Sequence, residues 1–446
     1  MPTIRQFQYL LTIAVLLVIS GSAQAKSIPL DHPNIHVKGA NYTFRSADKL
    51  HFCRFSEATL NAPLAEKLFN PSKAITNSGI KIQFKTASQV VKLIFTPQEG
   101  DNRGSEFAVL QNGEVTGTYN FKGDASKSDM LLEITNAHAG QATLFEVVLP
   151  SWSNVALTSM EIDANHDLLA YTPKQKPIYL ALGNSITHGV GQGSASYLTY
   201  PYLLAEKLGV DYYNLAVGGA KISPAIAAQT AEMPQADIIT ILIGYNDLFF
   251  NDKTVEQYTS SYREYVTEIR TNQPKATIFC ISLTHTRSTD NPETGVVPDD
   301  YRLALKTLVE EFQSNGDNNL FFVAGDAITS EANLHQDKPD DKTHMGIEGA
   351  ALFADELASI ISTVTANETP LDADLLSMTI QSQAGEVYIN AGCCDEKTVN
   401  IYNLQGTMVA SANICDAASF SVPSHGIYLV NVQSEKRMVQ SKVLIR

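Results

Sequence analysis

The chain has 446 residues, of which 44 % are hydrophobic and 18 % are charged, and its formal net charge is −15. This length is sufficient for two or three folded domains, and the apolar fraction excludes an intrinsically disordered protein. The negative charge argues against nucleic acid as a partner and leaves no basic patch for an anionic membrane.

The first 25 residues have the pattern of a signal peptide. Arg5 precedes an apolar run from Leu10 to Ile19, and Ala23-Gln24-Ala25 follows as a cleavage site of small residues. This apolar run is too short to span a bilayer, which argues against a membrane anchor. We therefore expect an exported protein that begins at Lys26 and has no transmembrane segment.

Residues 26–168 have the pattern of an all-β sandwich. Ile80, Ile82 and Phe84 stand at alternate positions, as do Val91, Leu93 and Phe95, and Asn112-Gly113 is a strong hairpin signal. Trp152 is the single tryptophan of the chain. It could offer a platform for stacking on a sugar, but packing within a loop is the favoured interpretation.

Residues 174–364 alternate between apolar strands and helical patterns. The predicted strands are Ile178–Leu182, Tyr212–Val217, Ile238–Ile243, Thr277–Leu283 and Leu320–Val323, and the helices lie near Tyr197–Leu208, Pro224–Glu232, Val255–Arg270, Asp300–Phe312 and Gly346–Val364. Five strand–helix units predict an α/β domain with a flavodoxin-like, doubly wound parallel sheet. A linker that contains Pro370 follows, and residues 375–446 return to short strands, which predicts a small C-terminal β-sandwich.

The cysteines are odd in number and fit no zinc motif. They are Cys53, Cys280, Cys393, Cys394 and Cys415. Export permits disulfides, so Cys393 or Cys394 could pair with Cys415, whereas Cys280 lies in an apolar strand and is expected to be a packed thiol. No cluster of His, Cys and Asp suggests a catalytic metal, and we expect no cofactor.

Polar signals follow several strands of the predicted parallel sheet. Ser185 comes after Gly183-Asn184 at the end of the first strand, and the other signals are Asn214–Gly219, Gly244–Asp247 and Asp341–His344. Because the carboxyl ends of parallel strands share one edge, these groups can converge on Ser185.

The converging groups contain all the parts needed for acyl transfer. A serine hydroxyl needs an adjacent base, which His344 can be, and Asp341 can orient that imidazole. The backbone N–H groups of Ser185 and Gly219, with the Asn246 amide, can donate to a developing oxyanion. Gly218 competes for this role, but the spacing from Asn214 favours Gly219. His188 and His285 lie at the same edge and could contact substrate, although a surface position is favoured for each.

Residues 178–363 resemble the SGNH (GDSL-type) hydrolases. The serine block of that family corresponds to Gly183–Ser185, its glycine block to Gly219, its Gly-x-Asn-Asp block to Gly244–Asp247 and its Asp-x-x-His block to Asp341–His344. Asn184 departs from the aspartate of many members, which puts an acidic role at that position in doubt. The resemblance implies a serine esterase with Ser185, His344 and Asp341 as its triad.

The flanking regions carry weaker resemblances. The β-domain before the hydrolase, with its strand Phe145–Pro150, looks like the ancillary sandwich of exported carbohydrate acetylesterases. The last residues look like a type IX secretion sorting domain, on Val399–Gly406, Gly426–Val430 and Lys442–Leu444. A generic adhesive Ig-like module is the alternative for the last domain.

We therefore expect an enzyme that is secreted or held at the cell surface of a Gram-negative bacterium and removes acetyl groups from polysaccharides or oligosaccharides. Its partners would be the acetylated carbohydrate substrate and the secretion machinery. A lipid esterase or lysophospholipase with the same triad, and a non-catalytic carbohydrate-binding protein, are the alternatives.

Overall fold

The chain forms two compact units, residues Met1–Ser362 and Thr363–Arg446. The computed structural model describes residues 25–63, 68–366, 379–383, 386–390, 397–403, 407–415, 417–424, 426–433 and 438–445. The predicted signal peptide lies outside these residues except for Ala25, which begins the first strand. The linker around Pro370 and the cysteines at 393 and 394 also lie outside them.

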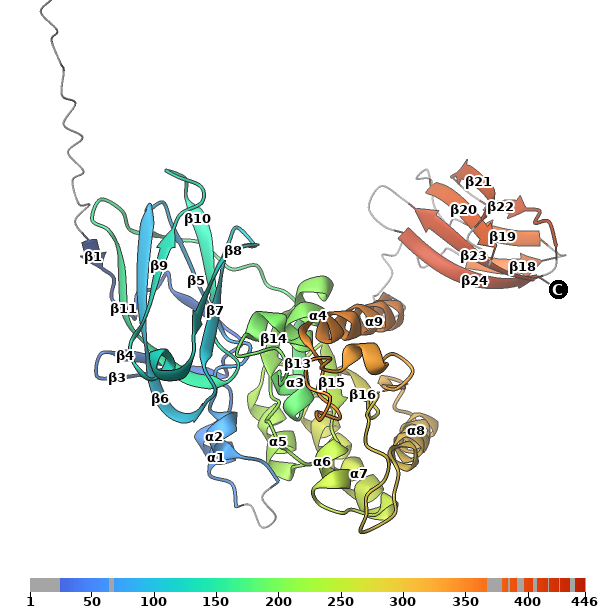
Figure 1. Ribbon diagram of the computed structural model, residues 1–446. Coiled ribbons are helices and arrows are strands. Elements are labelled where there is room, and N and C mark those ends of the chain that lie inside the picture. The colour runs from blue at the N-terminus through green and yellow to red at the C-terminus, as the bar shows by residue number, and fades with distance from the viewer. Residues whose placement is uncertain are drawn as a thin grey trace, which may run out of the picture. The chain divides into compact units, whose positions relative to one another are not determined.

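The first unit begins with a sandwich of two antiparallel sheets (Figure 1). One sheet has the order β3 (Tyr42–Ser46), β4 (Lys49–Cys53), β11 (Ser153–Asp163), β6 (Val90–Asn102) and β9 (Met130–Thr135), with β1 (Ala25–Ser27) beside β11. The other has the order β12 (Leu168–Leu169), β5 (Lys81–Thr86), β10 (Thr143–Val148), β7 (Ser105–Gln111) and β8 (Glu114–Phe121), with β2 (His36–Lys38) beside β5. Two short helices, α1 (Glu57–Leu60) and α2 (Pro71–Ala74), lie between β4 and β5.

Alternating side chains build the core between these two sheets. Ile82 and Phe84 of β5 face Val91 and Leu93 of β6 within one buried apolar cluster, as the alternation in the sequence predicts. The hairpin between β7 and β8 turns at Asn112 and Gly113, which both have positive φ (51° and 90°). Such a turn matches the twist of the strands that it joins.

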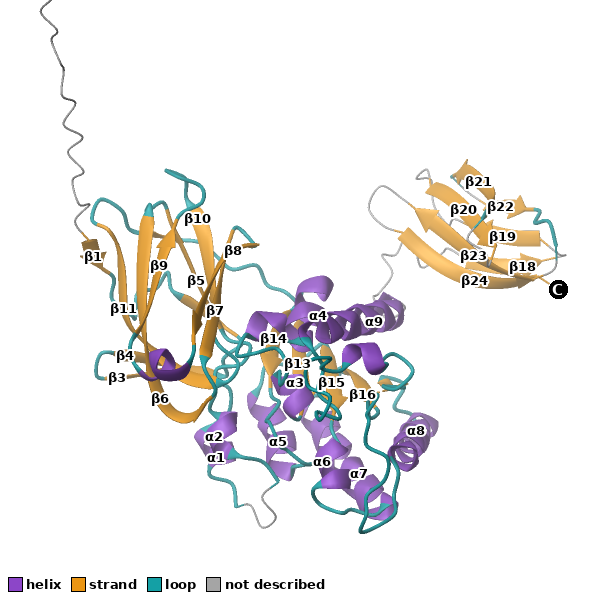
Figure 2. Ribbon diagram, in the orientation of Figure 1, coloured by secondary structure: helices purple, strands orange, loops and turns teal. Residues whose placement is uncertain are grey.

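A parallel five-stranded sheet forms the second half of this unit (Figure 2). Its order is β14 (Asp211–Asn214), β13 (Ile178–Gly183), β15 (Ile238–Leu242), β16 (Thr277–Ile281) and β17 (Leu320–Val323). The chain starts in β13, moves one step to β14 and then crosses back to β15, so the direction of winding reverses beside β13. Ligands of doubly wound sheets bind at such a reversal, and Ser185 lies immediately after β13.

Helices cover both faces of the parallel sheet, which confirms the predicted fold class. They are α3 (Ser185–His188), α4 (Tyr200–Leu208), α5 (Pro224–Gln229), α6 (Tyr245–Phe249), α7 (Val255–Asn272), α8 (Pro298–Ser314) and α9 (Ile347–Ala366). Side chains of α5, α7 and α8 share a buried apolar cluster with Leu180 and Leu182 of β13. On the other face Tyr202 of α4 packs against Tyr212, and α9 meets α4 where Phe353 contacts Tyr200.

The C-terminal unit contains two antiparallel sheets. One has the order β18 (Thr379–Gln383), β19 (Glu386–Asn390) and β22 (Ala417–Phe420), and the other β21 (Met408–Ile414), β20 (Lys397–Asn403), β23 (Gly426–Gln433) and β24 (Met438–Ile445). Val387 and Ile389 from the first sheet share one buried cluster with Val399, Ile401 and Val430 from the second. The unit is therefore a small sandwich with its own core, as the sequence predicts.

Two further expectations concern cysteines and membrane helices. Cys280 is fully buried in β16, which confirms a packed thiol, and burial raises its pKa to about 12. Cys415 is exposed, and its predicted pairing with Cys393 or Cys394 stays a prediction because both of those cysteines lie outside the described residues. Within the described ranges, none of the helices combines the length and apolarity needed to cross a membrane.

Candidate active site

A tight turn after β13 places Ser185 at the start of α3. A Cβ atom on Gly183 would lie only 2.7 Å from the Leu242 carbonyl oxygen, so the strand can end here only with glycine. The Asn184 side chain caps α3 by accepting a hydrogen bond from the Ile186 N–H at 3.0 Å. Asparagine caps a helix as well as aspartate does, so the amide of Asn184 can replace the carboxylate as the cap of α3.

Ser185, His344 and Asp341 form one hydrogen-bonded row. His344 Nε2 lies 2.7 Å from Ser185 Oγ, and His344 Nδ1 lies 2.9 Å from each carboxylate oxygen of Asp341. Asp341 also accepts the backbone N–H groups of Thr343 at 3.2 Å and His344 at 3.0 Å. Burial alone would raise the pKa of Asp341, but these hydrogen bonds and the imidazole hold it well below its usual value.

Two of the three candidate oxyanion donors, the Gly219 N–H and the Asn246 amide, lie on the turns after β14 and β15. The Gly218 N–H already donates to His188 Nδ1 at 3.0 Å, which leaves Gly219, at φ +82°, as the better candidate of the two glycines. Asn246 is buried, and its Nδ2 donates one hydrogen to the Ala220 carbonyl at 2.8 Å. This bond orients the amide while its second hydrogen stays available.

A buried carboxylate fixes the chain between these two turns. Both oxygens of Asp247 accept the Ile222 N–H, at 3.1 and 3.3 Å, and one lies 3.2 Å from Lys253 Nζ. Burial raises the pKa of Asp247, although the Lys253 ammonium opposes this effect. The second residue of the Asn-Asp pair thus holds the loop that follows Gly219.

An open pocket of about 650 Å³ contains this site. Its lining residues are Ser185, Tyr245, Asn246, Phe250, Asp337–Lys342, Thr343 and His344. The structure therefore brings four of the five predicted site residues to one cavity, and Gly219 is not among the lining residues. Most of the lining residues are of polar or charged types, and Tyr245 and Phe250 are the aromatic ones. Among the described residues there is no group of three or more His, Cys, Asp or Glu side chains that could hold a metal ion.

Three other residues that the sequence analysis considered for substrate contact lie outside this pocket. His188 is fully buried, so a surface position for it is wrong, and it does not line the pocket. Trp152 is also buried and donates from Nε1 to the Gly189 carbonyl at 3.0 Å, which confirms packing and rules out a sugar platform. His285 is partly exposed and pairs with Glu331 outside the pocket. The sequence near His188 does not show that the sandwich domain packs over this residue and buries it.

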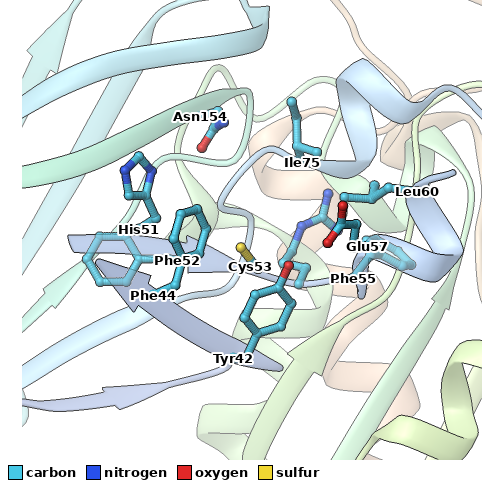
Figure 3. A pocket seen from close by; sticks show the side chains of 11 residues that line it. Tyr42, Phe44, His51, Phe52, Cys53, Phe55, Glu57, Leu60, Ile75 and Asn154 are labelled. Carbon is cyan, nitrogen blue, oxygen red and sulfur yellow. The ribbon is translucent and has the colours of Figure 1, made fainter. Parts of the chain in front are cut away.

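A second pocket, of about 460 Å³, lies on the sandwich (Figure 3). Tyr42, Phe44 and His51 line it, and the rings of Phe44 and His51 stack with 4.5 Å between their centroids. Tyr42 and Phe44 belong to the edge strand β3 and are exposed. None of the predicted catalytic residues lines this pocket, so it is a separate feature of the sandwich.

Comparison with protein families assigns both of the later domains. Residues 181–352 match the GDSL-like lipase/acylhydrolase family, and they contain Ser185, Gly219, Asn246, Asp341 and His344. The chain carries a GDSL-like acylhydrolase domain. Residues 383–446 match the secretion system C-terminal sorting domain, which indicates export to the cell surface or secretion. Comparison with curated protein sequences gives no match.

Solved structures share the fold of this acylhydrolase and extend the likeness beyond it. A salicylyl-acyltransferase from a tetracycline biosynthetic pathway is 21 % identical, with a TM-score of 0.67 over 78 % of this chain and 99 % of that one. A family two carbohydrate esterase from Clostridium thermocellum, in complex with cellohexaose, is 16 % identical, with a TM-score of 0.56 over 74 % and 99 %. An acetyl xylan esterase from the rumen bacterium Butyrivibrio proteoclasticus is 14 % identical, with a TM-score of 0.54 over 77 % and 98 %.

Proposed function

We propose that the protein is an exported serine esterase that removes acetyl groups from polysaccharides or oligosaccharides. The observation that carries this proposal is the row of hydrogen bonds from Asp341 through His344 to Ser185 Oγ, with 2.7 Å between the imidazole and the hydroxyl. This arrangement supplies a nucleophile, a base and a group that orients the base, which are the requirements of acyl transfer.

The reaction would proceed through an acyl-enzyme. Ser185 Oγ attacks the ester carbonyl while His344 Nε2 takes the hydroxyl proton, and Asp341 holds the Nδ1–H of the imidazolium that forms. The N–H groups of Ser185 and Gly219 and the free hydrogen of Asn246 Nδ2 donate to the oxyanion. His344 then protonates the leaving alcohol, and a water molecule that it activates releases acetate from Ser185.

The character of the pocket favours a short acyl group on a polar substrate. Charged side chains of the segment Asp337–Lys342 line one side, and the two aromatic residues of the pocket are few for a long acyl channel. Two of the structures with this fold are a carbohydrate esterase and an acetyl xylan esterase. The sorting domain would deliver the enzyme through the secretion machinery to extracellular polysaccharides, which cannot enter the cell.

The preferred acyl length tests this proposal directly. A site that bound a long acyl chain would gain about 0.8 kcal/mol for each buried CH₂ and would favour octanoyl esters. We expect the opposite order for kcat/KM on p-nitrophenyl esters, with acetyl best, butyryl lower and octanoyl almost inactive. Ser185→Ala is the matched control and should lower the rate on every ester by about 10⁴-fold or more.

The outcomes separate the competing functions. A kcat/KM that rises from acetyl to octanoyl would assign a lipid esterase in place of a deacetylase. Release of acetate from acetylated xylan, pectin or glucomannan by the native enzyme, and not by Ser185→Ala, would identify the polysaccharide. Binding of these polymers without any hydrolysis that depends on Ser185 would identify a non-catalytic carbohydrate-binding protein.

A further inference from the structure

The turn that carries Gly219 is held tightly on its sandwich side. A Cβ atom on Gly218 would lie 2.5 Å from the Trp152 ring, so the peptide packs directly against that indole. The Gly218 N–H donates to His188 Nδ1 at 3.0 Å. The Trp152 ring and His188 therefore fix Gly218, and the position of Gly218 orients the N–H of the adjacent Gly219.

His188 links helix α3 to the sandwich and to the glycine turn, because each of its two ring nitrogens has a hydrogen-bond partner. It is the last residue of α3, the helix that Ser185 begins. Its Nε2 lies 2.9 Å from the Ser151 carbonyl oxygen and 2.9 Å from Thr76 Oγ1, which both belong to the sandwich. Because a carbonyl only accepts, Nε2 carries the proton and Nδ1 is free to accept the Gly218 N–H. The Ser151 carbonyl thus selects the tautomer that holds the turn.

The surroundings of His188 keep this ring neutral and immobile. The Trp152 ring stacks on it with 3.9 Å between centroids and 20° between planes. Burial lowers the pKa of His188 well below its ordinary value, and the cationic side chains of Arg54, Arg103 and Lys73 lower it further. A protonated ring would have no acceptor for the Gly218 N–H, so this environment preserves the contact.

Arg54 holds the residues that lead into the turn of Gly218 and Gly219. Its guanidinium is buried, and Nη1 donates to the carbonyls of Asn214 at 2.7 Å and Ala216 at 2.8 Å. The other donors of Arg54 bind within the sandwich, to the Thr76 carbonyl at 2.6 Å and the Lys73 carbonyl at 3.0 Å. The strand end that leads into the glycine turn is thus hydrogen-bonded to the sandwich at two positions, Asn214 and Ala216.

We propose that the N-terminal sandwich sets the geometry of the oxyanion hole, with His188 as the positioning residue that transmits it to the Gly219 N–H. The inference rests on the proposed function, because it assigns the stabilisation of an oxyanion to this turn. It predicts that a change which spares Ser185, His344 and Asp341, and breaks only the contact to Gly218, slows the chemical step without weakening substrate binding.

Two substitutions at one position isolate that contact. The Oδ1 atom of His188→Asn can take the place of Nδ1 and accept the Gly218 N–H, while the donor to Ser151 is lost. The amide of His188→Gln can reach the Ser151 carbonyl in place of Nε2, while the acceptor for Gly218 is lost. Both variants lose the stacking on Trp152, so they should lose similar thermal stability.

We expect His188→Gln to lower kcat on p-nitrophenyl acetate by about tenfold to a hundredfold with little change in KM, because an oxyanion donor acts in the transition state. His188→Asn should stay within about threefold of the native kcat. A boronic acid that forms a tetrahedral adduct with Ser185 should bind more weakly to His188→Gln by the same factor as kcat/KM falls. The pair His138→Asn and His138→Gln, on a loop of the sandwich, is the control and should leave kcat unchanged.

Equal losses of kcat in His188→Asn and His188→Gln at equal melting temperature would overturn the proposal. Native enzyme without Ser185-dependent esterase activity would instead defeat the proposed function. If neither variant folds, the native protein still decides: nitrogen NMR of ¹⁵N-labelled histidine must show His188 with its proton on Nε2. A proton on Nδ1 would exclude the contact to Gly218.

Discussion

At the scale of single residues, the proposed oxyanion hole and the proposed triad place different demands on the chain. The hydroxyl of Ser185 needs only one neighbour at the right distance, and the residues between Asp341 and His344 form a compact turn that provides it. The oxyanion donors must be aimed at a point where charge exists only in the transition state. Their effects should therefore be visible in kcat more than in KM.

Asn246→Ala tests that distinction. We expect kcat to fall by about 10²- to 10³-fold with a smaller change in KM, since the amide hydrogen would bind the oxyanion and not the ground-state carbonyl. Steady-state kinetics on p-nitrophenyl acetate measure both constants. A raised KM with native kcat would assign Asn246 to substrate binding.

His188 also predicts how stability depends on pH. Its folded-state pKa lies well below the ordinary value of 6.5. Just below pH 6.5, His188 is therefore protonated in the unfolded chain and neutral in the folded chain. This contribution to stability is fully present above the unfolded pKa and is lost as the pH falls, by up to about 1.4 kcal/mol for each pH unit below it. Denaturant unfolding between about pH 7 and pH 5 should show a shallower loss for His188→Asn than for the native protein. Parallel losses would show that His188 is protonated in the folded state.

The convergence of Ser185, His344 and Asp341 could be predicted from the sequence, and the contacts of His188 could not. Ser185, Asp341 and His344 follow from the carboxyl ends of parallel strands and from the three-residue spacing of the Asp-x-x-His block. His188 lies in the same block as Ser185, but its partners Thr76 and Ser151 come from another domain. Such a contact depends on how the two domains pack against each other, so no pattern within either segment of the sequence predicts it.

At the scale of elements, the loop that carries Asp341 and His344 is held by the loop after β16. Arg287 Nη1 donates to the Asp341 carbonyl at 2.9 Å, and its Nε donates to Glu331 at 2.9 Å. The Arg287 N–H also donates to the Lys342 carbonyl at 2.8 Å. These contacts join two loops of the sheet and fix the backbone of the segment that carries His344.

Arg287→Met should therefore lower kcat by about tenfold, because a small misplacement of His344 weakens proton transfer. The backbone contact at Lys342 remains, so the loop should stay folded. Arg263→Met is a suitable control, since Arg263 also binds a glutamate through two bonds, to Glu311 at 2.7 Å each, on the surface of α7 and α8. Equal kcat and KM in the two variants would show that Arg287 does not position His344.

The long helices and buried strands were predicted to within a few residues because their periodicity extends over several turns. The helix predicted near Val255–Arg270 is α7 (Val255–Asn272), and the one near Asp300–Phe312 is α8 (Pro298–Ser314). The short helices α1 and α2 were not predicted, since four residues give no repeat to recognise. Yet α2 ends beside Thr76, which contacts His188, so a short element contributes to the candidate site.

At the scale of the whole molecule, the sorting domain and the acylhydrolase are separate units in sequence and in packing. The first unit contains all the predicted site residues, and the second has its own apolar core. Deleting residues from about 372 onward should leave kcat and KM unchanged in the purified enzyme and prevent its arrival at the cell surface. Fractionation of cells that express both forms, followed by an esterase assay of each fraction, measures this. An inactive or unfolded truncated protein would show that the last domain supports the first.

The buried guanidinium of Arg54 limits how this chain can be recombined with others. If the sandwich were exchanged for a different module, the carbonyls of Asn214 and Ala216 would lose a donor in a place that water cannot reach, and an unsatisfied buried carbonyl costs about 1–3 kcal/mol. An active chimera would need a donor of the same reach at the same point. The sandwich and the acylhydrolase domain should therefore be transferred together, and a library that shuffles only the acylhydrolase segment should yield folded but slow enzymes.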